Sequence, residues 1–491
     1  MDATLNLQRT DEPVERFDAQ PVNAPARRSL YKKREPIHPK QVHGPFRKLK
    51  WIVMAVTLAI YYGAPWLRWD RGPSAPDQAI LIDFPSRKFY FFFIEIWPQE
   101  VYYVTGLLIL AALGLFLVTS LAGRVWCGYT CPQTVWTDLF IAVERLVEGD
   151  RGARIRLDKA PWTAAKIGKR VAKHAIWLVI AVCTGGAWVF YFADAPTLAA
   201  DLLRFDAPMT AYLFIGGLTF TTYALGGLMR EQVCTYMCPW PRIQGALLDE
   251  DSLVVTYRPE RGEPRGAYRK GASWEGRGHC IDCNACVAAC PMGIDIRDGQ
   301  QLECITCALC IDACDEVMGK VGLPKGLIAY DTLANMDRRA KGESTRLRIV
   351  RPRTILYAAV IAVVGLVMLG TLATRSTLDV SVLRDRNPLF VTLSDGSIRN
   401  AYTLKVLNKE HAERRFAVAV AGIDGARVDI VGAPDGEPVL SVGPDTVRSF
   451  RVLVTAPRGS VRESRDVEFV VTDPSDGRVA RYDSYFWGPR R

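Results

Sequence analysis

Eight cysteines lie within 35 residues of this 491-residue chain, at a spacing that could bind metal. They form two runs, and each run has the spacing C-x2-C-x2-C-x3-C. A loop with this spacing presents three thiolates to one 4Fe–4S cluster, and the fourth cysteine crosses over to the neighbouring cluster. Such clusters move or store single electrons. The runs are Cys280, Cys283, Cys286 and Cys290, followed by Cys304, Cys307, Cys310 and Cys314.

The crossing predicts two sets of four ligands. Structural zinc, the competing interpretation, favours paired C-x2-C knuckles rather than four evenly stepped thiols, and a disulfide framework fits the spacing less well still. The cluster 1 set is Cys280, Cys283, Cys286 and Cys314, and the cluster 2 set is Cys304, Cys307, Cys310 and Cys290.

The second run departs from the usual pattern at its end. Asp315 follows Cys314, where the pattern usually has proline. The carboxylate would add negative charge near its cluster and lower the reduction potential, because the potential responds to local charge and exposure. The alternative is that Asp315 simply faces water.

Two further cysteine pairs share the sequence C-x3-C-P. Each pair follows an apolar segment, encloses an aromatic residue and precedes a tryptophan, so the chain contains an internal repeat. Cysteines at i and i+4 share one face of a helix, and four such thiols could converge if two helices pack together. The pairs are Cys127 and Cys131, before Pro132, and Cys234 and Cys238, before Pro239.

The chemistry of these four thiols suits copper. Thiolates and the adjacent Met237 thioether are soft ligands, which among biological metals select Cu(I). The same four cysteines could instead bind zinc, form redox-active disulfides or hold a further iron–sulfur centre. They could also be small packing residues. The repetition of the whole pattern, rather than any one cysteine, favours a function.

Five apolar segments surround these cysteines, and each approaches the roughly 20 residues that a helix needs to cross a bilayer. None carries a charge, which predicts a polytopic α-helical membrane protein with five spans. The aromatic stretch 89–97 is too short to cross, holds Glu95 and is predicted to lie at the membrane interface. The five segments are residues 51–67, 102–122, 175–193, 211–229 and 354–373.

Lysine and arginine alternate between rich and poor segments. Residues 1–50, 123–174 and 230–353 hold 11, 10 and 18 of them, whereas 68–101 hold 4 and 194–210 hold 1. Positive residues stay on the cytoplasmic side, so the N-terminus and the eight-cysteine segment are predicted to be cytoplasmic. The net charge of +10 then reports topology and not nucleic-acid binding. No cleavable signal peptide is evident, because the first apolar segment begins only near residue 51.

Composition divides the chain into five parts. The last part alternates polar and apolar residues in short stretches with Asp-Gly turns between them, which predicts an antiparallel immunoglobulin-like sandwich. The predicted parts are a flexible cytoplasmic tail (1–50), a membrane domain with four spans and both C-x3-C-P motifs (51–229), a cytoplasmic bacterial ferredoxin-like module (230–353), a fifth span (354–373) and an external sandwich (376–491).

The chain lacks the signatures of several other redox cofactors. Of its five histidines only His174 lies near a predicted span, which argues against a bis-histidine haem in the membrane. There is no P-loop and no dinucleotide-binding glycine signature in a βαβ context. The electrons must therefore come from a separate donor.

These features together resemble one family, the cytochrome c oxidase accessory proteins of the FixG/RdxA/CcoG type. The resemblance covers nearly the whole chain and rests on the C-x3-C-P sequences at 127–132 and 234–239, the double run at 280–314 and the C-terminal sandwich. NapH-like quinol dehydrogenase subunits share the cysteine motifs but lack that sandwich. The resemblance implies a bacterial inner-membrane protein, with its C-terminal domain in the periplasm, that assists assembly of the cbb-type oxidase.

The resemblance further implies an oxidoreductase that reduces Cu(II) to Cu(I) for copper delivery. The eight cysteines of the two runs would bind two 4Fe–4S clusters, and Cys127, Cys131, Cys234 and Cys238 would handle copper. A cytoplasmic donor would supply electrons, and the external domain would dock oxidase subunits or a copper chaperone. Two alternatives stay open: a quinol-linked electron conduit that does not touch copper, and a scaffold whose clusters only stabilise it. A homodimer is compatible with all three.

Overall fold

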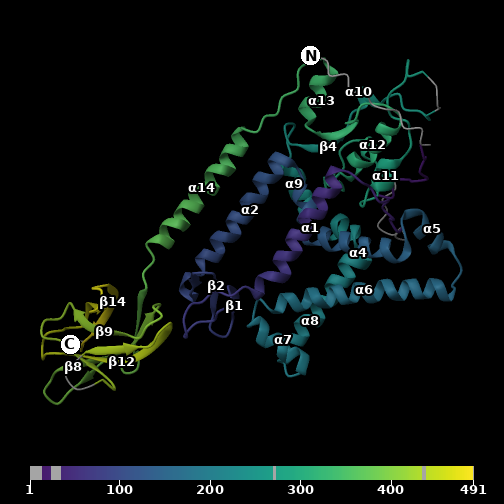
Figure 1. The fold of residues 1–491 in the computed structure, drawn as a ribbon. Coiled ribbons are helices and arrows are strands. Elements are labelled where there is room, and N and C mark those ends of the chain that lie inside the picture. Colours follow the sequence, from purple (N-terminus) through teal and green to yellow (C-terminus); the bar gives the residue numbers. More distant parts are fainter. Residues whose placement is uncertain (1–13, 24–34, 269–272, 434–437, 490–491) are drawn as a thin grey trace. The chain divides into compact units, whose positions relative to one another are not determined.

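The computed structural model describes residues 14–23, 35–268, 273–433 and 438–489. The chain forms two compact units (Figure 1). The first runs to Leu67 and resumes over Ala79–Met368, so it contains the long apolar helices and all thirteen cysteines. The second comprises Arg68–Gln78 and Leu369–Arg491 and is built mainly from β-strands.

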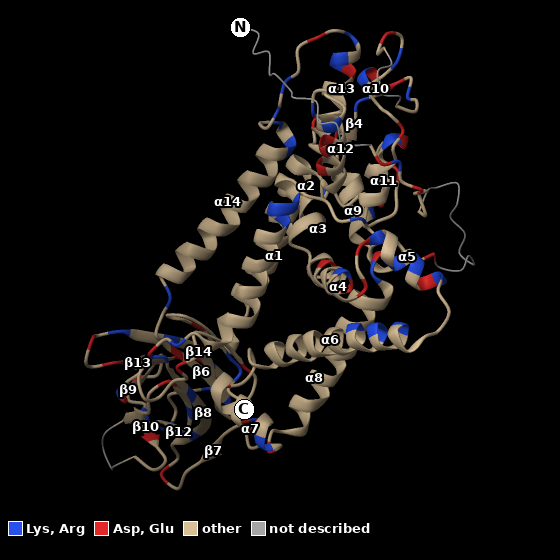
Figure 2. Ribbon diagram, turned by 45° about the vertical axis from the view of Figure 1, so that its right-hand side comes forward, with Lys and Arg blue, Asp and Glu red and all other residues tan. Residues whose placement is uncertain are grey.

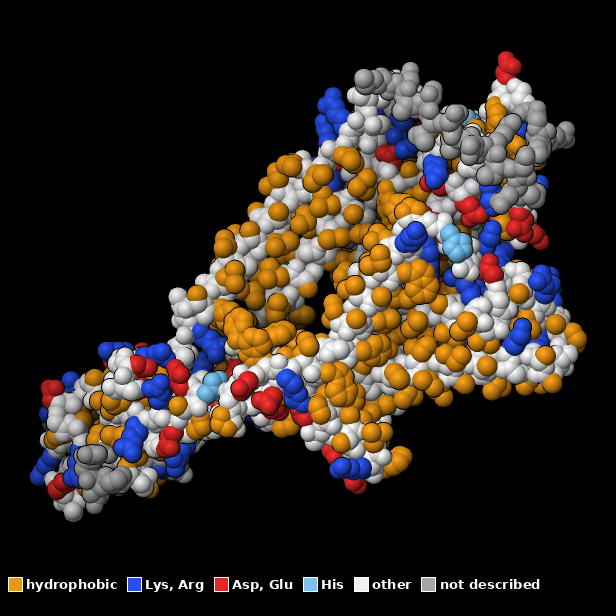
Figure 3. Space-filling view, viewed as in Figure 1, with side chains coloured by type: hydrophobic (Ala, Val, Ile, Leu, Met, Phe, Trp, Pro, Cys, Tyr) orange, Lys and Arg blue, Asp and Glu red, His pale blue; other side chains and the backbone are white. Residues whose placement is uncertain are grey.

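Long helices dominate the first unit, and their exposed side chains are mainly apolar (Figure 3). Among the described residues, four segments are long and apolar enough to cross a membrane: Pro98–Ala122, Ala164–Val189, Met209–Met229 and Pro352–Ala373. Helix α1 (Pro45–Gly63) is not one of them, because Arg47, Lys48 and Lys50 charge its first turns. The other long helices are α2 (Tyr102–Ala122), α6 (Ala164–Val189), α8 (Met209–Thr221) with its π-helical continuation η4 (Thr222–Met229), and α14 (Pro352–Ala373).

A small antiparallel sheet connects α1 to α2. Its strands, β1 (Ile80–Asp83), β2 (Lys88–Phe91) and β3 (Ile94–Ile96), pair in that order. The aromatic stretch 89–97 therefore forms parts of two strands and the turn between them, with Tyr90 and Trp97 buried. Its location at a membrane interface stays a prediction.

Shorter helices follow α2, α6 and α8. Figure 2 shows that charged residues gather around α5 and near α10–α13, whereas α2 and α14 are almost free of them over most of their length. The connecting elements are α3 (Val125–Tyr129), α4 (Pro132–Glu148), α5 (Arg151–Lys159), α7 (Ala195–Arg204), the π-helical turn η5 (Val233–Met237) and α9 (Trp240–Leu247).

The eight-cysteine segment folds beside a two-stranded sheet in which β4 (Val254–Tyr257) pairs with β5 (Ile328–Asp331). Buried aliphatic residues such as Ile281, Val317 and Leu327 form a core with the cysteines. The helices of this module are α10 (Pro259–Gly262), α11 (Ala285–Ala289), α12 (Leu309–Lys320) and α13 (Leu333–Ala340), with a 3-10 turn at Ile296–Asp298.

The N-terminal segment packs on this module wherever it is described. The N–H of Phe17 donates to the carbonyl of Cys283 at 2.9 Å, and the N–H of Lys40 donates to that of Ala288 at 2.8 Å. Residues 14–23 and 35–44 are thus held against the cluster loops instead of forming the flexible tail expected over 1–50. The remainder of that predicted tail, 1–13 and 24–34, lies outside the described residues.

The second unit contains two antiparallel sheets. One has the strand order β10-β12-β8-β6, with β7 against β8, and the other has the order β11-β9-β13-β14. Both contribute to one buried apolar cluster, in which the rings of Tyr402 and Phe469 lie 4.8 Å apart. The predicted alternating strands are present: β6 (Leu378–Arg384), β7 (Val391–Thr392), β8 (Ile398–Asn408), β9 (Arg414–Ala421), β10 (Arg427–Ile430), β11 (Val439–Val442), β12 (Thr446–Ala456), β13 (Ser464–Thr472) and β14 (Val479–Trp487).

Candidate metal centres

The two cysteine runs adopt the same unusual backbone. Asp282 and Asn284, on either side of Cys283, have φ of 52° and 57°, and Thr306 and Ala308, on either side of Cys307, have φ of 57° and 60°. Residues other than glycine rarely adopt this left-handed conformation, and they do so mainly at functional sites. Alternation of this kind turns successive N–H groups toward one concavity, which suits a bound anion or iron–sulfur cluster.

Backbone N–H groups reach the sulfur atoms in these loops. Burial raises the pKa of Cys304 to about 11, although a hydrogen bond from the N–H of Thr306 acts to lower it. Burial likewise raises the pKa of Cys290 to about 12, although hydrogen bonds from the N–H groups of Ile294 and Met292 act to lower it. Thiols this buried lose their protons when iron binds them, because metal coordination replaces the proton. A dry cradle of thiols with converging N–H donors fits an iron–sulfur cluster.

The thiols of each predicted set lie within electrostatic reach of one another. Cys314 interacts electrostatically with the other three members of the cluster 1 set, Cys286, Cys283 and Cys280. Cys310 interacts first with the other three members of the cluster 2 set, Cys307, Cys304 and Cys290. The structure therefore brings together both predicted sets. When bound there, the two clusters accept and release single electrons.

Asp315 has a role that neither expectation foresaw. Its Oδ1 accepts a hydrogen bond of 2.8 Å from the N–H of Gly326, so the carboxylate anchors a neighbouring turn. It is half-buried and still lies within electrostatic reach of Cys314. The side chain thus holds a loop and also places negative charge beside the cluster 1 set.

The two C-x3-C-P segments repeat in backbone conformation as well as in sequence. Gly123 and Arg230 each stand four residues before the first cysteine of a pair, with φ/ψ of 61°/−136° and 47°/−114°. The second cysteines, Cys131 and Cys238, have ψ of 127° and 125°, because proline disfavours a helical conformation in the residue before it. The expectation of a continuous helix with both cysteines on one face is therefore wrong. The helix is interrupted at the second cysteine of each pair instead.

The four thiols nevertheless come together, and they are called the four-thiol site below. Cys234 interacts with Cys131, Cys127 and Cys238, and its pKa is raised to about 12, chiefly by burial. The Cys127 thiol donates to Oε1 of Gln244 at 3.1 Å, and Gln244 is completely buried. Met237, expected beside the thiols, is 56% exposed.

The thiols do not converge on a single ion in this structure. Among the described residues, no three His, Cys, Asp or Glu side chains are close enough to hold one metal ion. The eight cluster cysteines are also too far apart to hold a single ion, because they must surround a four-iron cluster rather than one atom. A mononuclear metal at the four-thiol site therefore requires its side chains to close in.

The half of the four-thiol site that contains Cys127 and Cys131, its first half, packs on the loop of the cluster 2 set. A Cβ atom on Gly128 would lie 2.7 Å from the carbonyl oxygen of Ile305 and 3.0 Å from Cα of Cys307, so only glycine fits without movement. The hydroxyl of Tyr129 donates to the carbonyl of Cys307 at 3.3 Å, and Arg124 donates to that of Cys304 at 3.0 Å. The second half has Thr235 where the first has Gly128. Sequence reasoning missed this asymmetry.

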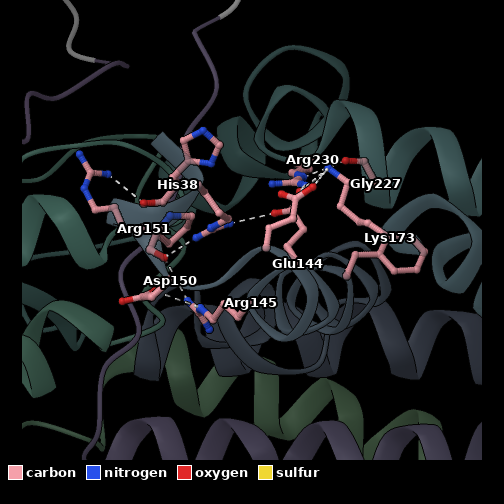
Figure 4. A network of polar contacts seen from close by, with 12 residues as sticks. His38, Glu144, Arg145, Asp150, Arg151, Lys173, Gly227 and Arg230 are labelled. Atoms are coloured by element: carbon pink, nitrogen blue, oxygen red, sulfur yellow. Dashed lines mark hydrogen bonds and ion pairs between the residues drawn. The ribbon is translucent and has the colours of Figure 1, made fainter. Parts of the chain in front are cut away.

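A buried ion-pair network joins the two halves (Figure 4). Glu144, in the helix that follows Cys131, contacts Arg154 at 2.9 Å, Lys173 at 3.4 Å and Arg230 at 2.5 Å. Burial alone would raise the pKa of Glu144, but these three cations outweigh it and lower the pKa to about 2. The carboxylate therefore stays charged and ties Arg230, just before the second cysteine pair, to the helix after the first.

Family models match most of the chain. A 4Fe-4S dicluster domain matches residues 229–333, which contain both cysteine runs, and confirms the two predicted 4Fe–4S clusters. A second 4Fe-4S binding domain matches residues 104–148, which contain Cys127 and Cys131. The Ig-like fold at the C-terminus of FixG matches residues 368–489.

Whole-chain relatives agree. The nitrogen fixation protein FixG of Rhizobium meliloti is 54% identical and the match covers 98% of each chain. Proteins RdxB and RdxA of Cereibacter sphaeroides are 54% and 52% identical over 94% of this chain and 98% and 99% of theirs. The crystal structure of a FixG-related protein from Vibrio parahaemolyticus is 24% identical over 23% of this chain and 96% of its own, with a TM-score of 0.20. With half of its residues identical to theirs over almost its full length, this chain belongs to the FixG/RdxA/RdxB family of iron–sulfur membrane proteins.

Proposed function

We propose that this protein reduces Cu(II) to Cu(I) at the four-thiol site and so supplies copper for assembly of a cbb-type oxidase. The observation that carries the proposal is the contact of Gly128 with the loop of the cluster 2 set. It brings the backbone next to Cys127 against the loop that carries Cys307. The clusters would supply, one at a time, the electrons that copper gains.

The four-thiol site suits the product of this reaction. Thiolates are soft donors and bind Cu(I) in preference to harder ions. Gln244 accepts from the Cys127 thiol and is itself held by a donor bond from its Nε2 to Thr119 at 3.3 Å, so it orients that ligand. The Glu144 network fixes the distance between the two halves of the site.

The packing of the N-terminal segment supports five membrane crossings with the clusters in the cytoplasm. That segment contacts the cluster loops, yet three apolar segments of spanning length separate them in sequence. Three crossings would place the two on opposite sides. A further crossing by α1 would place the N-terminal segment and the cluster loops on the same side of the membrane. The 19 residues of α1 extend about 28 Å, close to the thickness of the hydrocarbon core. The basic residues of both segments favour the cytoplasm.

The C-terminal domain would then lie in the periplasm as an immunoglobulin-like sandwich. The single apolar core shared by its two sheets supports that architecture. The domain contains no cysteine, so it needs no redox maintenance outside the cytoplasm. We propose that it docks oxidase subunits or a copper chaperone.

Cupric reduction by purified protein tests the copper proposal. The protein is reduced anaerobically, freed of excess reductant and mixed with Cu(II), and Cu(I) is followed with a specific chelator. The Cys131→Ser plus Cys238→Ser variant should lose most of the rate while keeping its iron. Cys183→Ser is the matched control, because Cys183 is exposed on α6 and belongs to neither group. Equal rates in the double variant and the wild type would reject the site.

A further iron–sulfur centre at the four thiols is the second candidate. The 4Fe-4S binding domain matched over residues 104–148 favours it, as does the absence of single-ion geometry among the described thiols. In that case the double variant would lose iron and sulfide rather than copper. Iron analysis of the same two samples separates the candidates.

Quinol as the electron donor is favoured by one cavity. A space of about 610 Å³ opens beside Cys304 and is also lined by Arg124, Leu302 and Leu248. Its size suits a small organic ligand, which typically occupies about 300–1,000 Å³. Cluster reduction that depends on added quinol would support this donor, and equal reduction without quinol would exclude it.

A further inference from the structure

We propose that a cavity between the start of α1 and helix α4 binds the phosphate headgroup of an anionic phospholipid. The cavity has a volume of about 580 Å³. The inference rests on the proposed membrane crossing by α1, whereas it is independent of copper chemistry. Its lining comprises residues 41–44, Arg47, Lys48, Trp51, Ala142, Val143, Arg145 and Leu146.

The lining is basic. Arg47, Lys48, Arg145 and His43 all line the cavity, and no acidic side chain does so among the described residues. The nearest carboxylates already pair with two of these lining cations. Asp138 binds Arg47, Asp312 accepts the N–H groups of Phe46 and Arg47, and Asp150 accepts the N–H of Gln41 and lies 3.7 Å from Arg145. The lining of this space therefore offers an anion only basic and uncharged side chains.

Arg47 lines this cavity and carries one donor that has no hydrogen-bond partner among the described residues. Its side chain is 6% exposed, and Nη1 donates to both carboxylate oxygens of Asp138 at 2.9 Å. Nη2 is buried with no hydrogen-bond partner in the part of the chain that the structure describes. A buried donor without a partner costs stability, and a phosphate oxygen would satisfy it. The guanidinium also stacks over Trp51 at 4.5 Å, which fixes its orientation.

The rim of the cavity is apolar, which selects a lipid over a free phosphate. Trp51 is 40% exposed and Leu146 is 81% exposed. Ile52 and Val56 continue the exposed apolar surface along α1. An acyl chain could lie on this surface while the headgroup enters the basic space. Such basic pockets beside membrane helices favour anionic headgroups.

Native mass spectrometry of the detergent-purified, full-length protein tests the proposal. It is titrated in parallel with phosphatidylglycerol, phosphatidylcholine and inorganic phosphate, and bound lipids are counted. We expect phosphatidylglycerol to remain bound and to raise the unfolding temperature. In His43→Gln plus Lys48→Gln its affinity should fall about fivefold, since one lysine near a membrane surface contributes about that factor. Both residues are exposed, so the variant should fold.

Lys405→Gln is the control with the same change in formal charge, placed on an exposed strand position of the C-terminal domain. It should bind phosphatidylglycerol as the wild type does. Equal affinity in the His43 and Lys48 variant would overturn the site. Equal stabilisation by phosphatidylcholine or by inorganic phosphate would overturn the choice of an anionic lipid. Copper reduction need not change in any of these samples.

Discussion

The eight cluster cysteines and the four-thiol site are built on different principles. The first group lies on two consecutive loops with the same left-handed positions around the central cysteines, so its geometry is specified within 35 residues. The second group comes from segments about a hundred residues apart, which meet through Gln244 and the Glu144 network. Cluster binding is therefore a local property, whereas the four-thiol site depends on tertiary contacts. Different substitutions should disable each group.

The largest effect is expected from a cluster ligand. Cys307→Ser removes one thiolate of the cluster 2 set, and iron and acid-labile sulfide should fall from about eight to about four per chain. Cupric reduction should fall to background, because the lost cluster lies beside the four-thiol site. Colorimetric iron and sulfide assays on anaerobic protein measure this. An unchanged iron content would show that Cys307 is not a ligand.

Loss of the central carboxylate should affect the four-thiol site before the clusters. Glu144→Gln removes the carboxylate that Arg154 and Arg230 share, while Lys173 keeps its pair with Glu148, and breaking a buried ion pair typically costs about 3–5 kcal/mol. Thermal unfolding should show this loss, and copper binding should weaken while iron content is kept. Glu316→Gln is the control, because its pair with Lys320 is partly exposed and worth less than about 1 kcal/mol. Equal destabilisation by both would contradict the importance of the network.

A methyl group at the contact between the two groups should slow electron delivery. Gly128→Ala pushes the Cys127 segment away from Ile305, and overpacking of this kind costs about 1–3 kcal/mol. We expect slower cupric reduction with full iron content. Gly114→Ala, on α2 with open space around the new methyl, should have the wild-type rate. A wild-type rate in Gly128→Ala would remove the main support for the proposed route.

The smallest effect should come from the charge beside Cys314. Asp315→Asn keeps an acceptor for Gly326 but removes the carboxylate's charge, so the potential of cluster 1 should rise by tens of millivolts. A redox titration followed by electron paramagnetic resonance measures both clusters. An equal shift of cluster 2 would mean that the effect is not local.

Local patterns were predictable from the sequence, and long-range contacts were not. The cysteine spacing predicted the two ligand sets that the structure brings together, and alternating residues predicted the strands of the C-terminal unit. The C-x3-C-P repeat predicted that the two cysteine pairs approach each other, but not the interruption of the helix before Pro132. The close approach at Gly128 and the binding of three cations by Glu144 depend on residues distant in sequence. The docking of Phe17 and Lys40 on the cluster loops also left no signal in a polar, proline-rich segment.

Metal analysis of anaerobically purified protein in which all four thiols are replaced by serine tests the separation of the two groups most directly. The account predicts about eight iron and eight sulfide per chain, as in the wild type, together with the loss of bound copper. A drop in iron with the four thiols, or copper retained without them, would contradict it.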